Sequence, residues 1–188
     1  MSDRVLRWGL LGTAHINRAV IPPLRASKRN QLVVVASRTL ERGRAYAKEW
    51  NIPRVTSYDA LLADPEIDVI YNSLPNSLHA EWTIKAAQAG KHVLCEKPLA
   101  VMVEQVDAMA VAARKHGVVV AEAFMYRHQP VILKVQELVR DGAIGELRLV
   151  RGSFTYLQSR PADVRLDPNL GGGSIWDVGC TRSVLRAP

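Results

Sequence analysis

The sequence predicts an α/β fold: a doubly wound parallel sheet over residues 1–125, followed by an incomplete second α/β domain over residues 126–188. Two observations support this prediction. Short β-type runs alternate strictly with amphipathic helical stretches up to about residue 125, and the pattern then changes to a single helix and an alternating polar–apolar run. Because strands that alternate with helices pair in parallel through right-handed crossovers, the first domain should be an open, twisted sheet.

The elements of the first domain follow from side-chain periodicity. The expected strands are Val5–Leu11, Gln31–Ser37, Arg54–Thr56, Val69–Ser73, His92–Glu96 and Val118–Ala123. The expected helices are Ile16–Ala26, Leu40–Trp50, Tyr58–Ala63, Leu78–Ala89 and Val103–His116. The valine-rich second strand should be buried on both faces. Ser57 should cap the third helix, and Gly90 and Gly117 should end the last two.

The second domain begins with a predicted helix at Val131–Arg140 and a half-exposed strand at Leu147–Tyr156. A further helix should start at Ser174, after the run Gly171-Gly172-Gly173. About 60 residues follow the first domain, fewer than the roughly 100–150 of a complete one, so we expect this second domain to be truncated.

Composition limits the function classes. The 188 residues are 48% hydrophobic and 23% charged, which is typical of a globular protein and excludes disordered, collagen-like and polytopic membrane chains. Cys95 and Cys180 are too few for a disulfide framework or a zinc site, so we expect no metal. Without a signal peptide at the N-terminus, a cytoplasmic location and no membrane partner are expected.

The net charge of +7 comes from the first 50 residues, where ten Lys and Arg face three Asp and Glu. No basic tail or basic helix with interleaved aromatic residues carries this excess, so we expect no nucleic-acid partner. Most of these arginines are explained as scattered residues on the solvent-exposed surface. The alternative is that some of them form a local anion-binding site near Arg38.

The turn Gly9-Leu10-Leu11-Gly12-Thr13-Ala14 lies between the first expected strand and helix. Glycines there allow a tight turn and a close approach to a pyrophosphate, which then binds amides at the helix N-terminus. Thr13 and Ala14 complete the turn. The alternative is a plain strand–helix connection, but the position at the start of the domain favours a nucleotide site.

The end of the second strand indicates which dinucleotide binds. An NAD site usually places an acidic residue there, whereas this chain has Ser37 and Arg38, with Arg42 one helical turn further. A hydroxyl and guanidinium groups suit a 2′-phosphate, so we predict NADP, with NAD less favoured. The alternative is a pair of surface arginines at a helix start.

Cys95-Glu96-Lys97-Pro98 stands at the end of the fifth strand. Ligands of open α/β sheets bind outside the carboxyl ends of the strands, so Lys97 should face the nicotinamide and could exchange a proton with a substrate hydroxyl. A surface ion pair before a helix is the alternative.

These motifs, with Pro75-Asn76-Ser77-Leu78-His79, Glu122-Ala123-Phe124-Met125-Tyr126-Arg127 and Gly171–Cys180 in the same order, resemble the glucose–fructose oxidoreductase/inositol dehydrogenase (Gfo/Idh/MocA) family. They look most like its branch of D-xylose and trans-dihydrodiol dehydrogenases. The resemblance implies an NAD(P)-binding Rossmann domain and a second domain whose open sheet covers the nicotinamide. It also implies a small-molecule sugar or diol substrate, and homo-oligomers among full-length relatives.

The resemblance assigns roles to single residues. Lys97 matches the catalytic lysine, with Glu96 beside it at the cofactor. Asn76 and His79 match the segment that borders the nicotinamide and its ribose. Glu122 and Arg127 match a segment under the active site, where a structural ion pair is the alternative.

Asp177 matches an aspartate that faces substrate or cofactor. Four residues later the family places a catalytic Tyr or His, whereas this chain has Thr181, which is a poor acid or base. A single-base deletion in codons for Cys-Tyr-Pro-Val-Ser would give the observed Cys-Thr-Arg-Ser. The resemblance implies an NADP-dependent oxidoreductase acting on a hydroxyl-bearing carbon; the alternative is a truncated, catalytically silent nucleotide-binding fragment.

Overall fold

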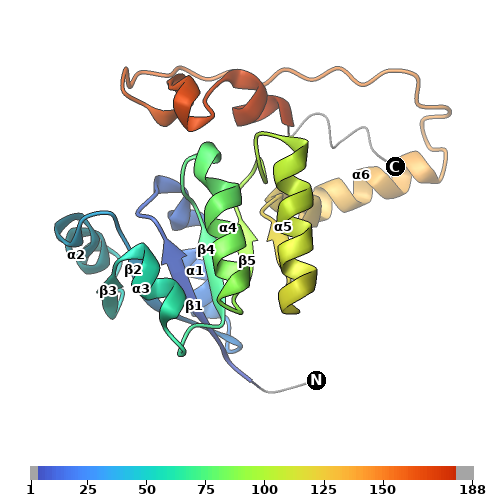
Figure 1. Cartoon of the computed structure of the whole chain (residues 1–188). Coiled ribbons are helices and arrows are strands. Elements are labelled where there is room, and N and C mark those ends of the chain that lie inside the picture. The colour runs from blue at the N-terminus through green and yellow to red at the C-terminus, as the bar shows by residue number, and fades with distance from the viewer. Residues whose placement is uncertain (1–3, 181–188) are drawn as a thin grey trace.

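The computed structural model describes residues 4–180, and its strands form one parallel sheet (Figure 1). The strands are β1 (Leu6–Leu11), β2 (Asn30–Ala36), β3 (Arg54–Thr56), β4 (Val69–Asn72), β5 (His92–Cys95) and β6 (Val120–Glu122). Their order is β3-β2-β1-β4-β5-β6, so the winding reverses between β1 and β4. This order confirms the predicted doubly wound fold.

Helices cover both faces of the sheet. They are α1 (Ile21–Ala26), α2 (Leu40–Glu49), α3 (Tyr58–Ala63), α4 (His79–Gln88) and α5 (Val103–His116), whereas α6 (Pro130–Arg140) follows the sheet and has no buried residue. Successive strand residues point to opposite faces: Leu10 packs with Ile21 of α1, and Leu11 packs with Leu61 of α3. In the part of the chain from residue 4 to residue 180, no helix is both long and apolar enough to cross a membrane.

Two expected helices differ from the structure at their starts. The stretch Ile16–Ala26 is divided into a 3₁₀ helix at His15–Ala19 and the α1 helix. The division falls before Pro22 and Pro23, which lack the N–H that an interior helical position needs but fit a first turn. The helix expected from Leu78 begins as a 3₁₀ turn at Asn76–Leu78 and becomes α4 one residue later.

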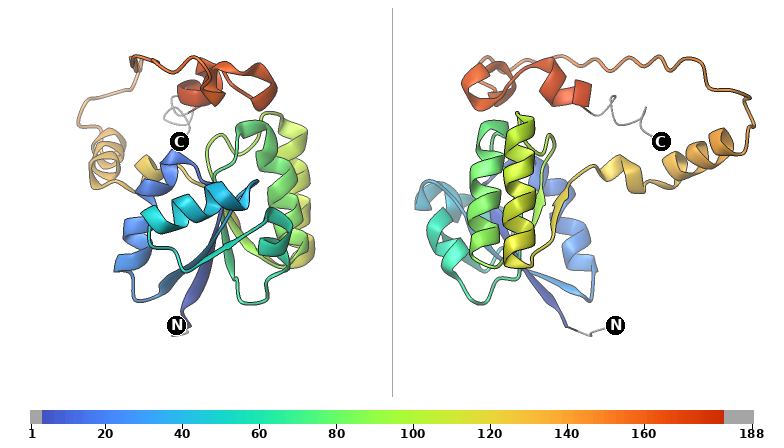
Figure 2. Two further views of the ribbon diagram at one scale, coloured as in Figure 1. Left: turned by 90° about the vertical axis from the view of Figure 1, so that its left-hand side faces the viewer. Right: turned by 45° about the vertical axis from the view of Figure 1, so that its right-hand side comes forward.

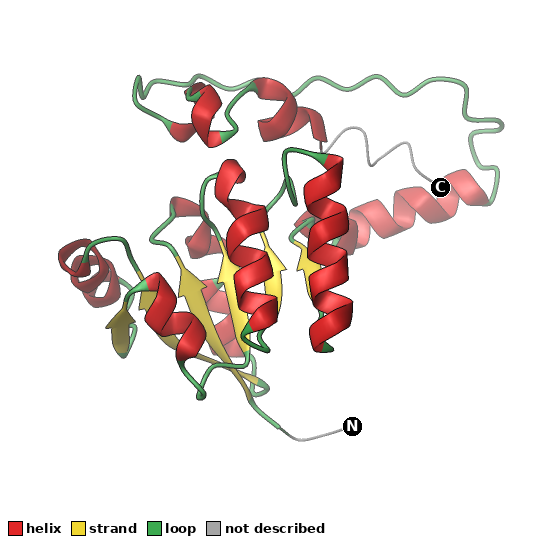
Figure 3. Cartoon of the chain, in the orientation of Figure 1, coloured by secondary structure: helices red, strands yellow, loops and turns green. Residues whose placement is uncertain are grey.

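The chain beyond the sheet leaves the domain and then returns to it. Helix α6 projects from the end of β6, residues 147–160 follow without a helix or strand, and the chain then crosses above the carboxyl ends of the strands (Figures 2 and 3). The returning part consists of two 3₁₀ turns, Val164–Leu166 and Pro168–Leu170, and a π-helical turn at Ile175–Gly179. This part, residues 163–180, is called the cap below.

The predicted strand Leu147–Tyr156 is wrong for this structure. The segment has no partner strand within the described residues, and its apolar side chains stay exposed, Leu149 at 65% and Phe154 at 61%. Alternation of polar and apolar residues creates a face suited to a sheet, but a strand forms only where a neighbour accepts its backbone hydrogen bonds.

Candidate functional site

The glycine turn after β1 is closely packed. Gly12 has a φ of +104°, which favours glycine, and a Cβ there would lie 3.1 Å from Leu74 Cδ2. A Cβ on Gly9 would lie 2.5 Å from Leu61 Cδ1. The side chain of Asn17 donates from Nδ2 to the Gly12 carbonyl at 2.9 Å and so holds the turn from the following helix. Sequence reasoning missed Asn17, because a helical asparagine carries no local signal of its partner.

This turn fits the pyrophosphate of a dinucleotide. The chain passes through Thr13 and Ala14 into the 3₁₀ helix His15–Ala19, whose first N–H groups have no partner within the helix. Such groups bind anions, and the glycines let the turn pack closely against Leu61 and Leu74. The turn also lies next to the point where the strand order reverses, the usual ligand position in doubly wound sheets.

The end of β2 carries two exposed arginines beside a half-buried tyrosine. Burial raises the pKa of Tyr58, while the charges of Arg38 and Arg42 lower it, so both guanidinium groups lie within electrostatic range of the Tyr58 hydroxyl. Neither arginine takes part in an ion pair with another described residue. Ser37 is buried beneath α2, where the absence of a side chain on Gly43 permits a close approach. The arginines are therefore available to an anion at this edge.

Lys97 follows β5 and is supported from below by buried polar side chains. Glu96 is 8% exposed and accepts a hydrogen bond from the Tyr71 hydroxyl. His79 is 1% exposed, with Nδ1 2.7 Å from the Pro98 carbonyl and Nε2 2.8 Å from the Leu74 carbonyl. Burial lowers the pKa of His79. The polar atoms of Glu96 and His79 thus contact the protein interior around the loop that carries Lys97.

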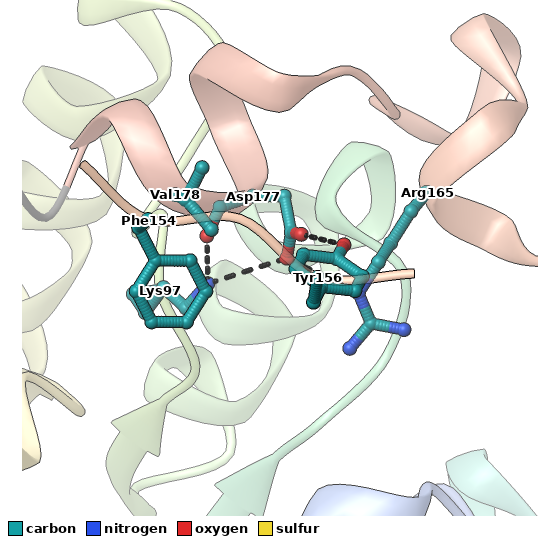
Figure 4. A pocket seen from close by; sticks show the side chains of 6 residues that line it. All are labelled: Lys97, Phe154, Tyr156, Arg165, Asp177 and Val178. Carbon is teal, nitrogen blue, oxygen red and sulfur yellow. Dashed lines mark hydrogen bonds and ion pairs between the residues drawn. The ribbon is translucent and has the colours of Figure 1, made fainter. Parts of the chain in front are cut away.

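Lys97 and Asp177 meet above the sheet (Figure 4). The Lys97 ammonium donates to the Asp177 carbonyl, and its Nζ lies 3.6 Å from Asp177 Oδ1. The Tyr156 hydroxyl donates to Oδ2 of the same carboxylate, and Arg165 Nε donates to Oδ1 at 3.1 Å. Burial raises the pKa of Asp177, but the Tyr156 hydrogen bond and the charges of Lys97 and Arg165 outweigh it, so the pKa is below its usual value. A carboxylate so placed stays charged and orients the lysine.

The lysine and the aspartate line a cavity of about 250 Å³. Its lining consists of Lys97, Phe154, Tyr156, Arg165, Asp177 and Val178 (Figure 4). Sequence reasoning missed Tyr156 and Arg165. Tyr156 stood at the end of an expected strand and Arg165 within a polar loop, and neither place indicates that the cap brings them to Lys97.

Three further residues that the sequence analysis singled out lie in separate places. Asn76 donates from Nδ2 to the Gly171 carbonyl at 2.8 Å and so joins the loop after β4 to the cap. Glu122 accepts a hydrogen bond from the Leu99 N–H at 2.8 Å, and among the described residues it forms no ion pair with Arg127. Thr181 lies outside the described residues.

A doubly wound parallel sheet with a glycine turn after β1 is the arrangement of dinucleotide-binding Rossmann domains. Residues 6–124 match the family model described as an oxidoreductase family with an NAD-binding Rossmann fold, and residues 132–181 match the GFO/IDH/MocA C-terminal domain. The chain belongs to the GFO/IDH/MocA family of oxidoreductases, as its motifs predicted.

Known relatives include sugar and diol enzymes. The chain is 43% identical to D-xylose 1-dehydrogenase (NADP(+)) 2 of Haloferax volcanii over 93% of its own length and 54% of that protein. It is 38% identical to trans-1,2-dihydrobenzene-1,2-diol dehydrogenase of Xenopus laevis, over 93% of this chain and 53% of that protein. The chain thus spans about half the length of these relatives.

A solved structure shares the arrangement. KijD10, a 3-ketoreductase from Actinomadura kijaniata in complex with NADP and TDP-benzene, superposes with a TM-score of 0.88 at 35% identity. The match covers 94% of this chain and 55% of KijD10.

Proposed function

We propose that this chain carries the cofactor-binding domain and the lysine–aspartate part of an NADP-dependent oxidoreductase. The reaction would move a hydride between the nicotinamide and a hydroxyl-bearing carbon of a sugar or cyclic diol. The observation that carries the proposal is the meeting of Lys97 and Asp177 at the sheet edge that also holds the glycine turn. The sugar and diol dehydrogenases among the relatives support this substrate class.

The choice of NADP rests on the edge of β2. Arg38 and Arg42 lie near Tyr58 and have no ion-pair partner among the described residues, so they can bind a 2′-phosphate. The Haloferax relative is named for NADP(+), and KijD10 was crystallised with NADP, which supports the same choice here.

Four of the residues that line the cavity have a task in this proposal. Bound NADP would supply the hydride acceptor or donor. In the oxidation direction the neutral Lys97 amine would accept the proton of the reacting hydroxyl at Nζ, and in the reduction direction the ammonium would donate that proton to the carbonyl oxygen. Asp177 would keep the ammonium in place and accept a hydrogen bond from a second substrate hydroxyl. Phe154 and Tyr156 would provide a surface for the ring of the substrate.

Titration of the whole chain with NADPH and with NADH, followed by tryptophan fluorescence, tests the cofactor half of this proposal. Tighter binding of NADPH supports it, and no binding of either nucleotide contradicts it. Turnover with NADP⁺ and D-xylose or a trans-dihydrodiol tests the other half. A second reading, a nucleotide-binding fragment without activity, is favoured by the exposed apolar segment around Leu149, and NADPH binding without any turnover would support it.

A further inference from the structure

The loop after β5 is held by side chains at three successive residues. This segment, residues 97–100, is called the lysine loop. The Lys97 N–H donates to Glu96 Oε2 at 3.3 Å, the Pro98 carbonyl lies 2.7 Å from His79 Nδ1, and the Leu99 N–H donates to Glu122 Oε1 at 2.8 Å. Loops lack the regular backbone pairing of helices and strands, so these side chains fix the path of the loop.

The three residues that bond to the lysine loop come from different elements of the domain. Glu96 directly precedes the loop, His79 is the first residue of α4, and Glu122 is the last residue of β6. Glu122 therefore ties the loop to the neighbouring strand, which a residue adjacent in sequence cannot do. It bonds an N–H only two residues from Lys97, so its position bears directly on where the lysine backbone lies.

The surroundings of Glu122 favour this bond over an ion pair. The pKa of Glu122 is above its usual value. Burial is the largest cause and the Glu96 charge adds to it, while the Leu99 N–H and the Arg127 charge act in the opposite direction. Cys95 and Tyr126 also lie within electrostatic range of Glu122. Arg127 forms no ion pair with Glu122 in the described part of the chain, so the carboxylate is directed to the loop.

We propose that Glu122 is a positioning residue for Lys97: its carboxylate holds Leu99 and thereby keeps the Lys97 side chain against Asp177. The chemical importance of Lys97 rests on the proposed function, but the positioning itself does not. The two can therefore fail separately.

Competitive acetylation of the folded chain measures the accessibility of each lysine in one sample. Lys97 has a 28% exposed side chain held by Asp177, whereas Lys85 is 44% exposed on α4. In Glu122→Ala we expect Lys97 to be labelled about three to ten times faster, the scale of one lost hydrogen bond, with the Lys85 rate unchanged. Glu122→Gln keeps an oxygen acceptor of the same shape and should stay within about twofold of the wild type.

Asp107→Ala on the exposed side of α5 is the matched control and should leave both rates unchanged. An unchanged Lys97 rate in Glu122→Ala, or an equal rise for Lys97 and Lys85, would overturn the positioning role. NADPH titration of the same samples separates the two ideas. Failure of the wild type to bind NADPH contradicts the proposed function, while a selective Lys97 response still supports Glu122.

A measurement on the unmodified chain guards against a variant that fails to fold. In a ¹H–¹⁵N NMR titration, the Leu99 amide should shift as the Glu122 carboxyl titrates, with a midpoint above the usual glutamate value. The amide of Val35, which is buried in β2 between Leu10 and Val55, serves as the reference. A Leu99 amide that does not respond between about pH 4 and pH 7 would refute the bond.

Discussion

Lys97 and Asp177 stand 80 residues apart in the sequence, yet the lysine ammonium contacts both the carbonyl and the carboxylate of the aspartate. The first residue belongs to the sheet domain and the second to the cap. This pair, with Asn76 on Gly171, attaches the cap over the carboxyl ends of the strands. The candidate site therefore exists only while the cap is docked.

Asp177→Asn should loosen the cap. The substitution keeps an oxygen for Tyr156 but removes the charge that Lys97 and Arg165 face, so protection of residues 163–177 from hydrogen exchange should fall about fivefold at pH 7. Because the folded-state pKa of Asp177 is lowered, its stabilisation is present above the unfolded value near pH 4 and is lost as the pH falls through the folded value. Asp141→Asn on the exposed end of α6 should change nothing. Equal protection in the wild type and Asp177→Asn would contradict the pairing.

Arg38→Ala should weaken NADPH binding selectively. Loss of a charged hydrogen bond to the 2′-phosphate costs roughly 1.5–3 kcal/mol, while NADH, which lacks this phosphate, should bind as before. Fluorescence titration of both nucleotides measures the difference. Arg44→Ala, an exposed arginine on the same helix as Arg42, is the control. Equal losses for the two cofactors would make Arg38 a structural residue.

Gly171→Ala should detach the cap from Asn76. A Cβ at residue 171 would lie 2.8 Å from Asn76 Cβ, and the φ of +76° adds a backbone cost of about 1–2 kcal/mol. Gly145→Ala has nearly the same φ, +70°, with nothing within 4 Å, so it carries the backbone cost alone. Tryptic cleavage after Arg165 should accelerate at least about tenfold more in Gly171→Ala than in Gly145→Ala. Matching rates in these variants would show that the cap does not rest on Asn76.

Asp68→Asn should reduce the stability of the sheet domain at neutral pH. Arg7 donates to Asp68 from its side chain at 3.0 Å and from its backbone N–H at 2.9 Å, and this lowers the pKa of Asp68 to about 2. The lowered pKa of Asp68 stabilises the fold above about pH 4, and this contribution falls between about pH 4 and pH 2 and is lost below about pH 2. We expect a loss of roughly 1–2 kcal/mol in urea unfolding at pH 7, less than full linkage gives because solvent screens the arginines.

At pH 2 the difference between the wild type and Asp68→Asn should be less than half of that at pH 7, because about half of Asp68 is then protonated in the folded state. Asp107→Asn, an exposed residue beyond the first turn of α5, is the control at both pH values. A deficit of Asp68→Asn that persists unchanged at pH 2 would assign the effect to shape instead of charge.

Most of the sheet domain could be predicted from the sequence. Val-rich runs such as the one in β2 need burial on both faces, and glycines such as Gly117, with a φ of +63°, end helices by a local conformational preference. These signals depend only on neighbours in the chain. The rule that parallel strands present their carboxyl ends at one edge then placed Lys97 and the glycine turn of residues 9–14 together without any coordinates.

The prediction failed where an element depends on a partner. The polar–apolar alternation of Leu147–Tyr156 is real, but in the described structure no strand lies beside it, so the segment stays extended and exposed. The sequence analysis also placed His79 and Glu96 along the cofactor, and that placement stays a prediction. The structure shows their polar atoms bonded to Pro98, Leu74 and Tyr71 under the lysine loop.

By itself, the sequence determined the doubly wound sheet, the glycine turn and the edge at which Lys97 stands, because periodicity and backbone preference act over a few residues. Only the tertiary structure decided that Asp177 reaches Lys97, that Tyr156 and Arg165 share its carboxylate, and that Glu122 holds Leu99. Those contacts depend on how segments distant in the sequence pack and on where each side chain then points. A local sequence pattern predicts neither.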